Sequence, residues 1–111
     1  MKMDVISAEN GITKLVLTGS MNIQGALDVE PRFNEIVKTT DKIIVDLKDV
    51  SFLTSLGMRV LVMSARALRE KGGKLVLANP QTEVERVMKI AGIDTVIDIA
   101  PDLSTAIALF R

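Results

Sequence analysis

Few of the residue types that usually carry out acid-base or metal chemistry are present in this chain. Cys and His are both absent, which excludes disulfides, thiolate metal sites, a Ser-His-Asp triad and ordinary zinc sites. Asp46 and Asp49 are a candidate carboxylate pair, but nothing else in the sequence completes a catalytic or metal site around them. We therefore expect a protein that is not an enzyme and holds no cofactor and no metal.

A phosphate-binding motif is only partly present. Gly73-Lys74 resembles the end of a P-loop, which requires Gly five residues before Gly73 and Ser or Thr after Lys74. Leu68 and Leu75 stand at those two positions, so the motif fails twice. A small hydrolase or nucleotide-binding enzyme is an alternative without motif support.

Ser55 is the hydroxyl with the most informative setting. It follows an apolar strand predicted at 43–47 and a loop at 48–54, and it begins a helix predicted at 55–71. A helix N-terminus exposes unpaired N–H groups and a partial positive charge, so a phosphate on Ser55 would lie in favourable surroundings. The alternative is that Ser55 only caps the helix, the commonest role of Ser at this position.

The far side of that predicted helix carries an unusual mixture of residues. Val62 and Met63 lie within a solvent-facing arc, with Leu56 and Met58 near its edges; the charged members of the arc are Arg59, Arg66, Arg69 and Glu70. A surface helix normally keeps its apolar residues on one stripe. The mixture predicts a contact surface for a partner, although scattered exposed apolar side chains are also common.

Composition and charge narrow the classes of partner. The 111 residues are 48% hydrophobic, and 14 basic residues balance 14 acidic ones. This size and composition predict one soluble domain over residues 1–111. A neutral chain has no broad basic field for nucleic acid or anionic lipid. No export signal or spanning apolar run is recognisable, so we expect a cytoplasmic protein with no direct nucleic-acid or membrane partner.

Hydrophobic periodicity predicts alternating strands and helices. Asn10-Gly11 supplies a tight hairpin turn between the first two strands, Gly19 ends the second strand, and Pro31 is expected to kink or interrupt the first helix. The order β-β-α-β-α-β-α-β-α predicts an α/β fold with a mixed, mainly parallel sheet of about five strands and about four helices. The expected strands are 5–8, 12–17, 43–47, 74–78 and 95–99, and the expected helices are 23–39, 55–71, 82–91 and 102–110.

Three segments together resemble a known family. The stretch 45–57, which ends in Thr54-Ser55-Leu56-Gly57, is similar to the D-S-x-G signature of STAS domains. Residues 17–22 look like the G-x-L-D element of that family, and 71–78 look like its G-G-x-L-x-L-A segment. The similarity covers nearly the whole chain, and the order and spacing of the motifs are more specific than any one of them.

The resemblance implies a role as an anti-sigma factor antagonist. Small STAS proteins of this kind bind, in their unphosphorylated form, an anti-sigma factor that is also a serine kinase, and so release a sigma factor. The kinase phosphorylates the Ser of D-S-x-G and abolishes binding, and a serine phosphatase resets the switch. Alignment on Gly57 places that residue at Ser55, with Thr54 as the second choice of acceptor.

The same resemblance suggests where a partner would bind, and also where this chain departs from the pattern. The expected partner-binding residues are Asn22, Ile23, Thr54, Leu56, Met58, Arg59 and Val62. Thr54 and Asn22 stand where the family usually has Asp, so a phosphate here should meet less like-charge repulsion. The alternative is a STAS-type scaffold or ligand-binding module that lacks a phosphorylation switch.

Overall fold

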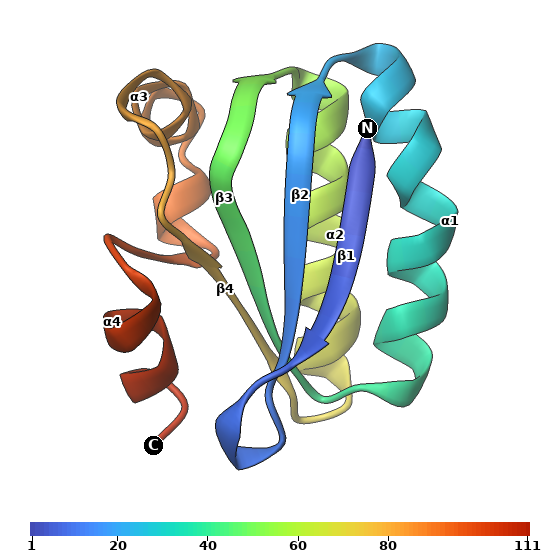
Figure 1. Cartoon of the computed structure of the whole chain (residues 1–111), viewed down its shortest axis with the longest axis vertical. Coiled ribbons are helices and arrows are strands. Elements are labelled where there is room, and N and C mark those ends of the chain that lie inside the picture. The colour runs from blue at the N-terminus through green and yellow to red at the C-terminus, as the bar shows by residue number, and fades with distance from the viewer.

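The computed structural model describes all 111 residues and contains five strands and four helices (Figure 1). Short 3₁₀ turns at Glu9–Gly11 and Ile93–Thr95 complete the regular structure. The elements in chain order are β1 (Lys2–Ser7), β2 (Thr13–Met21), α1 (Ile23–Thr39), β3 (Lys42–Leu53), α2 (Ser55–Glu70), β4 (Lys74–Ala78), α3 (Thr82–Ile90), β5 (Asp98–Ala100) and α4 (Leu103–Ala108).

The five strands form one sheet in the order β1-β2-β3-β4-β5. β1 pairs with β2 in the antiparallel direction, and the other three pairings are parallel. The α/β fold class predicted from the alternation of elements is therefore confirmed. Helices α1 and α2 pack against one face and enclose the larger core around Phe33, Leu61 and Leu68, whereas α4 covers part of the other face (Figure 1).

The turn between β1 and β2 has the geometry that its sequence predicts. Asn10 and Gly11 adopt positive φ angles of 62° and 73°. Asn and Gly tolerate this left-handed region better than other residues, which allows the chain to reverse within a few residues. The predicted hairpin between the first two strands is confirmed, although β1 begins earlier than expected, at Lys2.

Strands β2 and β3 run further than the sequence predicted, and this extension positions the later site. Gly19 was expected to end β2, but the strand passes through it with φ of 119° and continues to Met21. The predicted loop at 48–54 is wrong as well, because β3 continues to Leu53. The two strands support each other by pairing up to Met21 and Leu53, with register shifts that accommodate the irregular stretch.

A buried carboxylate stabilises the irregular stretch of β3. Asp46 is only 2% exposed, and its Oδ1 accepts hydrogen bonds from the Lys48 amide at 3.1 Å and the Asn79 side-chain amide at 3.3 Å. The Gln81 side chain donates to the carbonyl oxygen of Lys48 at 2.9 Å. A buried polar group is stable only when it has hydrogen-bond partners, and these bonds supply them to Asp46. The same bonds join β3 to the segment that enters α3.

The bounds predicted for α1 are confirmed, whereas the last strand begins later than predicted. α1 is continuous through Pro31, which is exposed, so the carbonyl left without its N–H donor can bond to water. The last strand was expected at 95–99 but lies at Asp98–Ala100. A 3₁₀ turn at Ile93–Thr95, entered through Gly92 with φ of 78°, uses the residues where the strand was expected to begin.

One edge of the sheet is contacted by a helix side chain. The guanidinium of Arg32 in α1 donates to the carbonyl oxygen of Met3 in the edge strand β1 at 2.8 Å. Val5 and Ile6 of the same strand are about half exposed.

No helix of the structure has both the length and the apolar character needed to cross a membrane.

Replacing Asp46 tests the buried network. Asp46→Ala removes the acceptor for the Lys48 and Asn79 N–H groups, which are part-buried, and the loss of such hydrogen bonds typically costs about 1–3 kcal/mol. We expect the melting temperature to fall by about 4 °C for each kcal/mol lost, as measured by circular dichroism. Asp49→Ala is the matched control, because Asp49 lies on the same strand but is exposed and should change stability by less than about 0.5 kcal/mol. Equal melting temperatures for the two variants would contradict the role of Asp46.

Candidate functional site

The start of α2 is held by Thr54, the residue before the helix. The Thr54 hydroxyl oxygen accepts a hydrogen bond from the Gly57 amide at 3.2 Å and donates to the carbonyl oxygen of Met21 at 2.9 Å. The Thr54 amide donates to the same carbonyl at 3.1 Å. These bonds join the end of β3 to the end of β2. The alternative in which Ser55 caps the helix is wrong, because Thr54 is the N-cap.

Ser55 occupies the first position of α2, and its side chain is exposed with no hydrogen bond to another residue of the protein. Below it, the first turn of the helix packs closely on the sheet at Gly57. A Cβ atom at Gly57 would lie 2.9 Å from side-chain atoms of Leu53 and Met21, so any larger residue would require these side chains to shift. The close packing of Gly57 fixes the helix start, while the Ser55 hydroxyl faces solvent.

The surface around Ser55 is a shallow, open hollow of about 550 Å³. It contains no charged side chain, and most of its lining is apolar. The residues that line it are Ile23, Leu53, Thr54, Ser55, Leu56, Met58 and Val87. Neither here nor elsewhere in the chain do three or more acidic side chains gather to hold a metal ion. The arrangement is suited to contact with another protein more than to acid-base chemistry.

The structure brings together some of the predicted partner residues and not others. Ile23, Thr54, Leu56 and Met58 line the hollow with Ser55. Asn22, Arg59 and Val62 lie outside it; Asn22 caps α1 by accepting the Gly25 amide at 2.8 Å. The predicted exposure of Val62 is only partly correct, because its side chain is half-buried against the core.

Two lining residues were missed by the sequence analysis. Leu53 was assigned to a loop, and Val87 comes from α3, which is distant in sequence. In α3 the core-facing residues are Val84 and Met88, so the half-buried Val87 is an apolar residue beside the buried stripe. An apolar residue outside the buried stripe was the available signal, but only the lining of the hollow shows that Val87 of α3 lies near Ser55.

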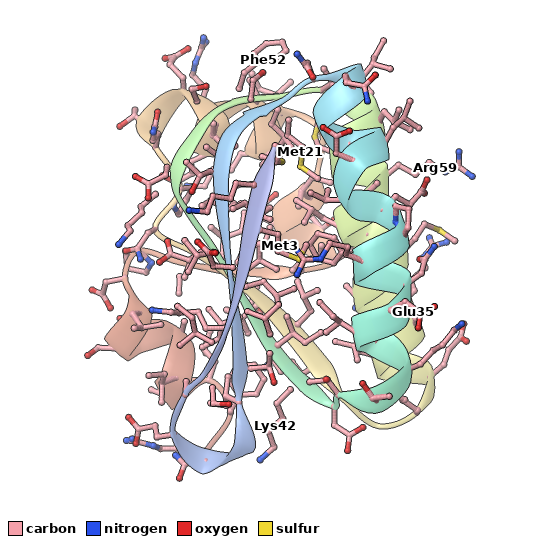
Figure 2. The ribbon with its side chains drawn as sticks, turned by 45° about the vertical axis from the view of Figure 1, so that its right-hand side comes forward. Met3, Met21, Glu35, Lys42, Phe52 and Arg59 are labelled. Carbon is pink, nitrogen blue, oxygen red and sulfur yellow. The ribbon has the colours of Figure 1, made fainter.

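Arg59 lies one helical turn after Ser55 and projects outward from α2 toward solvent (Figure 2). It takes part in none of the side-chain hydrogen bonds or ion pairs found in the protein. The other cations near this end differ, since Arg86 pairs with Glu83 at 2.9 Å and Lys89 pairs with Glu85 at 3.3 Å. Arg59 is therefore a free positive charge beside an uncharged hollow.

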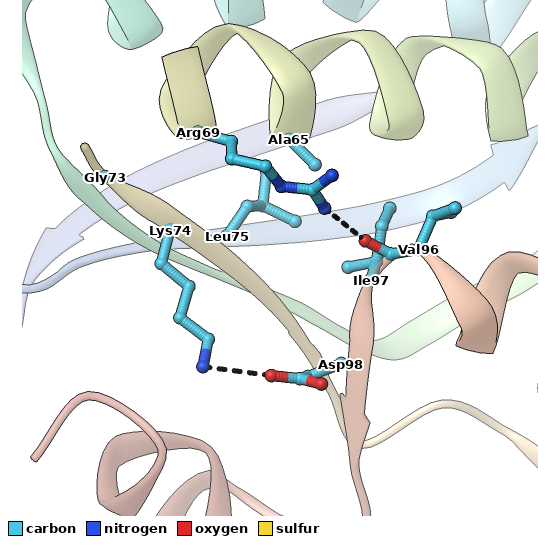
Figure 3. A pocket seen from close by; sticks show the side chains of 8 residues that line it. All are labelled: Ala65, Arg69, Gly73, Lys74, Leu75, Val96, Ile97 and Asp98. Carbon is cyan, nitrogen blue, oxygen red and sulfur yellow. Dashed lines mark hydrogen bonds and ion pairs between the residues drawn. The ribbon is translucent and has the colours of Figure 1, made fainter. Parts of the chain in front are cut away.

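A second cavity, of about 240 Å³, lies between α2, β4 and β5 (Figure 3). Its two cations already have partners within the protein: Arg69 donates to the carbonyl oxygen of Val96 at 2.7 Å, and Lys74 pairs with Asp98 at 3.0 Å. Arg69 also lies about 20 Å along the helix from Ser55, given the usual rise per residue. This cavity is thus separate from the hollow around Ser55, and its two cations are engaged in contacts within the protein.

Comparison with known proteins establishes the family. A family model described as the STAS domain matches residues 5–106. The chain belongs to the STAS domain family. This STAS chain is 28% identical over 98 residues to the anti-sigma-B factor antagonist of Bacillus subtilis, which covers 88% of this chain and 89% of the relative.

Solved STAS structures have the same fold. An anti-sigma factor antagonist from Mycobacterium paratuberculosis superimposes with a TM-score of 0.85 at 19% identity, covering 97% of this chain and 93% of that one. The phosphorylated form of the Bacillus cell fate determinant SpoIIAA superimposes with a TM-score of 0.73 at 18% identity, covering 99% of this chain and 100% of that one. These similarities confirm the predicted STAS fold.

The two departures from the usual STAS pattern both lie at helix caps. Asn22 and Thr54 cap α1 and α2, a role that the expected Asp could also fill. Thr54 adds an interaction that an ionised Asp cannot make, because a carboxylate only accepts hydrogen bonds and the Thr54 hydroxyl donates to Met21. The replacements keep both caps and remove two negative charges from this end of the domain.

Substitutions at position 54 should reduce stability far more than a substitution at position 55. Thr54→Ala removes the cap and the bond to Met21, so we expect a loss of about 1–3 kcal/mol. Thr54→Ser should keep most of both interactions, whereas Thr54→Asp should keep the cap alone and fall between the two. Ser55→Ala is the control and should unfold within about 0.5 kcal/mol of the parent in urea titrations. A larger loss for Ser55→Ala than for Thr54→Ala would contradict this assignment of the cap.

Proposed function

We propose that this protein is an anti-sigma factor antagonist whose binding is switched off by phosphorylation of Ser55. The unphosphorylated form binds an anti-sigma factor with serine kinase activity and so releases a sigma factor, and a serine phosphatase restores binding. The observation that carries the proposal is the exposed Ser55 hydroxyl at the start of α2, surrounded by an apolar hollow. Membership of the STAS family and similarity to named antagonists support it.

The local geometry favours Ser55 over Thr54 as the phosphate acceptor. The Thr54 hydroxyl is half-buried and already makes two hydrogen bonds that hold the helix start. Transfer of phosphate to that oxygen would require the helix start to open. The Ser55 side chain is exposed and makes no such bond, so a kinase can reach it without disturbing the fold.

Charge is sufficient to explain how the modification would release a partner. A phosphate adds about −1.5 to −2 charges at neutral pH. The hollow lining offers no cation, so a docked partner would have to bury that charge against neutral and apolar groups. A micromolar complex has a binding free energy near −8 kcal/mol, and a penalty of about 3 kcal/mol weakens it by roughly a hundredfold. The phosphorylated form of SpoIIAA has this fold, which supports a mechanism that leaves the fold intact.

The proposal is tested by isolating the anti-sigma factor kinase with this protein and measuring affinity by calorimetry without ATP. We expect unmodified protein and Ser55→Ala to bind alike, and the Ser55-phosphorylated protein to bind at least a hundredfold more weakly. Ser55→Asp should weaken binding less, because a carboxylate carries less charge than a phosphate. Thr54→Ser is the matched control for a hydroxyl change beside the site and should remain regulated.

Two results would contradict the switch. Phosphate incorporated into Ser55→Ala by the kinase would show that another residue accepts it. Equal affinity of the modified and unmodified proteins would favour a STAS scaffold or ligand-binding module without regulation at this position.

A further inference from the structure

We propose that Arg59 is the internal partner of a phosphate on Ser55, so that the modified side chain forms an ion pair along the surface of α2. The inference rests on the proposed phosphorylation of Ser55 but concerns what the protein itself does with the phosphate. It assigns to Arg59 a role in stabilising the modified state, in addition to its predicted position near the partner.

The spacing of the two residues brings their side chains together. Ser55 and Arg59 are four residues apart in a continuous α-helix, and residues at this spacing are neighbours on one face, with Cβ atoms about 5–6 Å apart. Both side chains are exposed, so neither needs to leave the core to reach the other. The long Arg side chain spans the remaining distance, and its planar guanidinium matches phosphate oxygens in a two-pronged contact.

Arg59 is an unpaired cation on the same helix as Ser55. It forms none of the ion pairs found in the chain, whereas Arg86 and Lys89 of the neighbouring α3 are paired with glutamates of their own helix. No acid competes for it from the caps, because Asn22 and Thr54 stand where relatives usually carry Asp. A phosphate would therefore find an unpaired guanidinium one turn along its own helix and no carboxylate at the two cap positions.

The ion pair would also change the surface that a partner meets beside the hollow. Arg59 is among the residues expected to contact a partner, and a phosphate that binds it removes that cation from the docking surface. Phosphorylation would then withdraw a cation from the partner, while the pair offsets part of the charge that a docked partner would have to bury. It would also hold the phosphate against the helix, which keeps the modified state folded.

The pair can be tested without kinase or partner, using full-length protein with phosphoserine incorporated at position 55 during synthesis. A nearby guanidinium favours the dianion, so it should lower the second pKa of the phosphate, which is ordinarily near 6. By ³¹P NMR titration at low salt, we expect this pKa to be lower by about 0.3 unit or more than in Arg59→Gln. Arg59→Lys should retain part of the shift.

Arg66→Gln is the matched control. Arg66 is exposed on the same face of α2 but two turns further from Ser55, so its loss should leave the phosphate pKa within about 0.1 unit of the parent. The melting temperature gives a second readout. The change in melting temperature on phosphorylation should be more favourable by about 2 °C in the parent than in Arg59→Gln, because only the parent can form the ion pair.

The outcomes separate this inference from the proposed function. Identical phosphate pKa values in the parent, Arg59→Gln and Arg66→Gln would overturn the ion pair, even if phosphorylation still releases the partner. A shifted pKa in protein that still binds its partner when phosphorylated would leave the pair intact and overturn the switch. Equal effects of Arg59→Gln and Arg66→Gln would indicate general electrostatics and would also overturn the specific pair.

Discussion

The hydrogen bonds from Thr54 to the carbonyl oxygen of Met21 determine how this end of the domain is built. They join the ends of two parallel strands, from which α1 and α2 both begin, so the two helix starts lie side by side (Figure 1). Because Thr54 caps α2 and also bonds to Met21, Ser55 occupies the first helical position and its side chain is exposed to solvent. The exposure of Ser55 is therefore a consequence of the bonding of its neighbour.

The neutral character of the site follows from the same two cap positions. Asn22 and Thr54 satisfy the helix N-termini without a formal charge, and the hollow between α1, α2 and α3 has no charged lining residue. The hollow is open to solvent in the free protein, and electrostatic interactions there would strengthen only when a docked partner excludes water. A phosphate on Ser55 would then be the only charged group of the hollow, and the proposed ion pair would place the Arg59 guanidinium beside it.

The sequence predicted the elements that have strong periodicity and missed those that depend on tertiary contacts. The hairpin at Asn10-Gly11 and the parallel order of β2, β3 and β4 follow from local turn chemistry and alternation. The continuation of β3 to Leu53 could not be read from Lys48-Asp49, because polar residues there are tolerated only through pairing with β2 and the bonds of Asp46. Val87 joined the site for a similar reason: its placement depends on how α3 packs, which no local pattern encodes. The residues contributed by a single helix start, Ser55, Leu56 and Met58, were predictable from spacing.

The contact between Arg32 and the carbonyl oxygen of Met3 has a consequence for self-association. An open sheet edge invites strands of other copies to pair with it, and β1 is such an edge, with Val5 and Ile6 exposed. The guanidinium occupies one of the acceptors that an incoming strand would need and places a charge beside the others. The opposite edge, β5, is only three residues long and offers little to extend. Both margins of the sheet thus offer an incoming strand fewer free partners than a long, uncovered edge would.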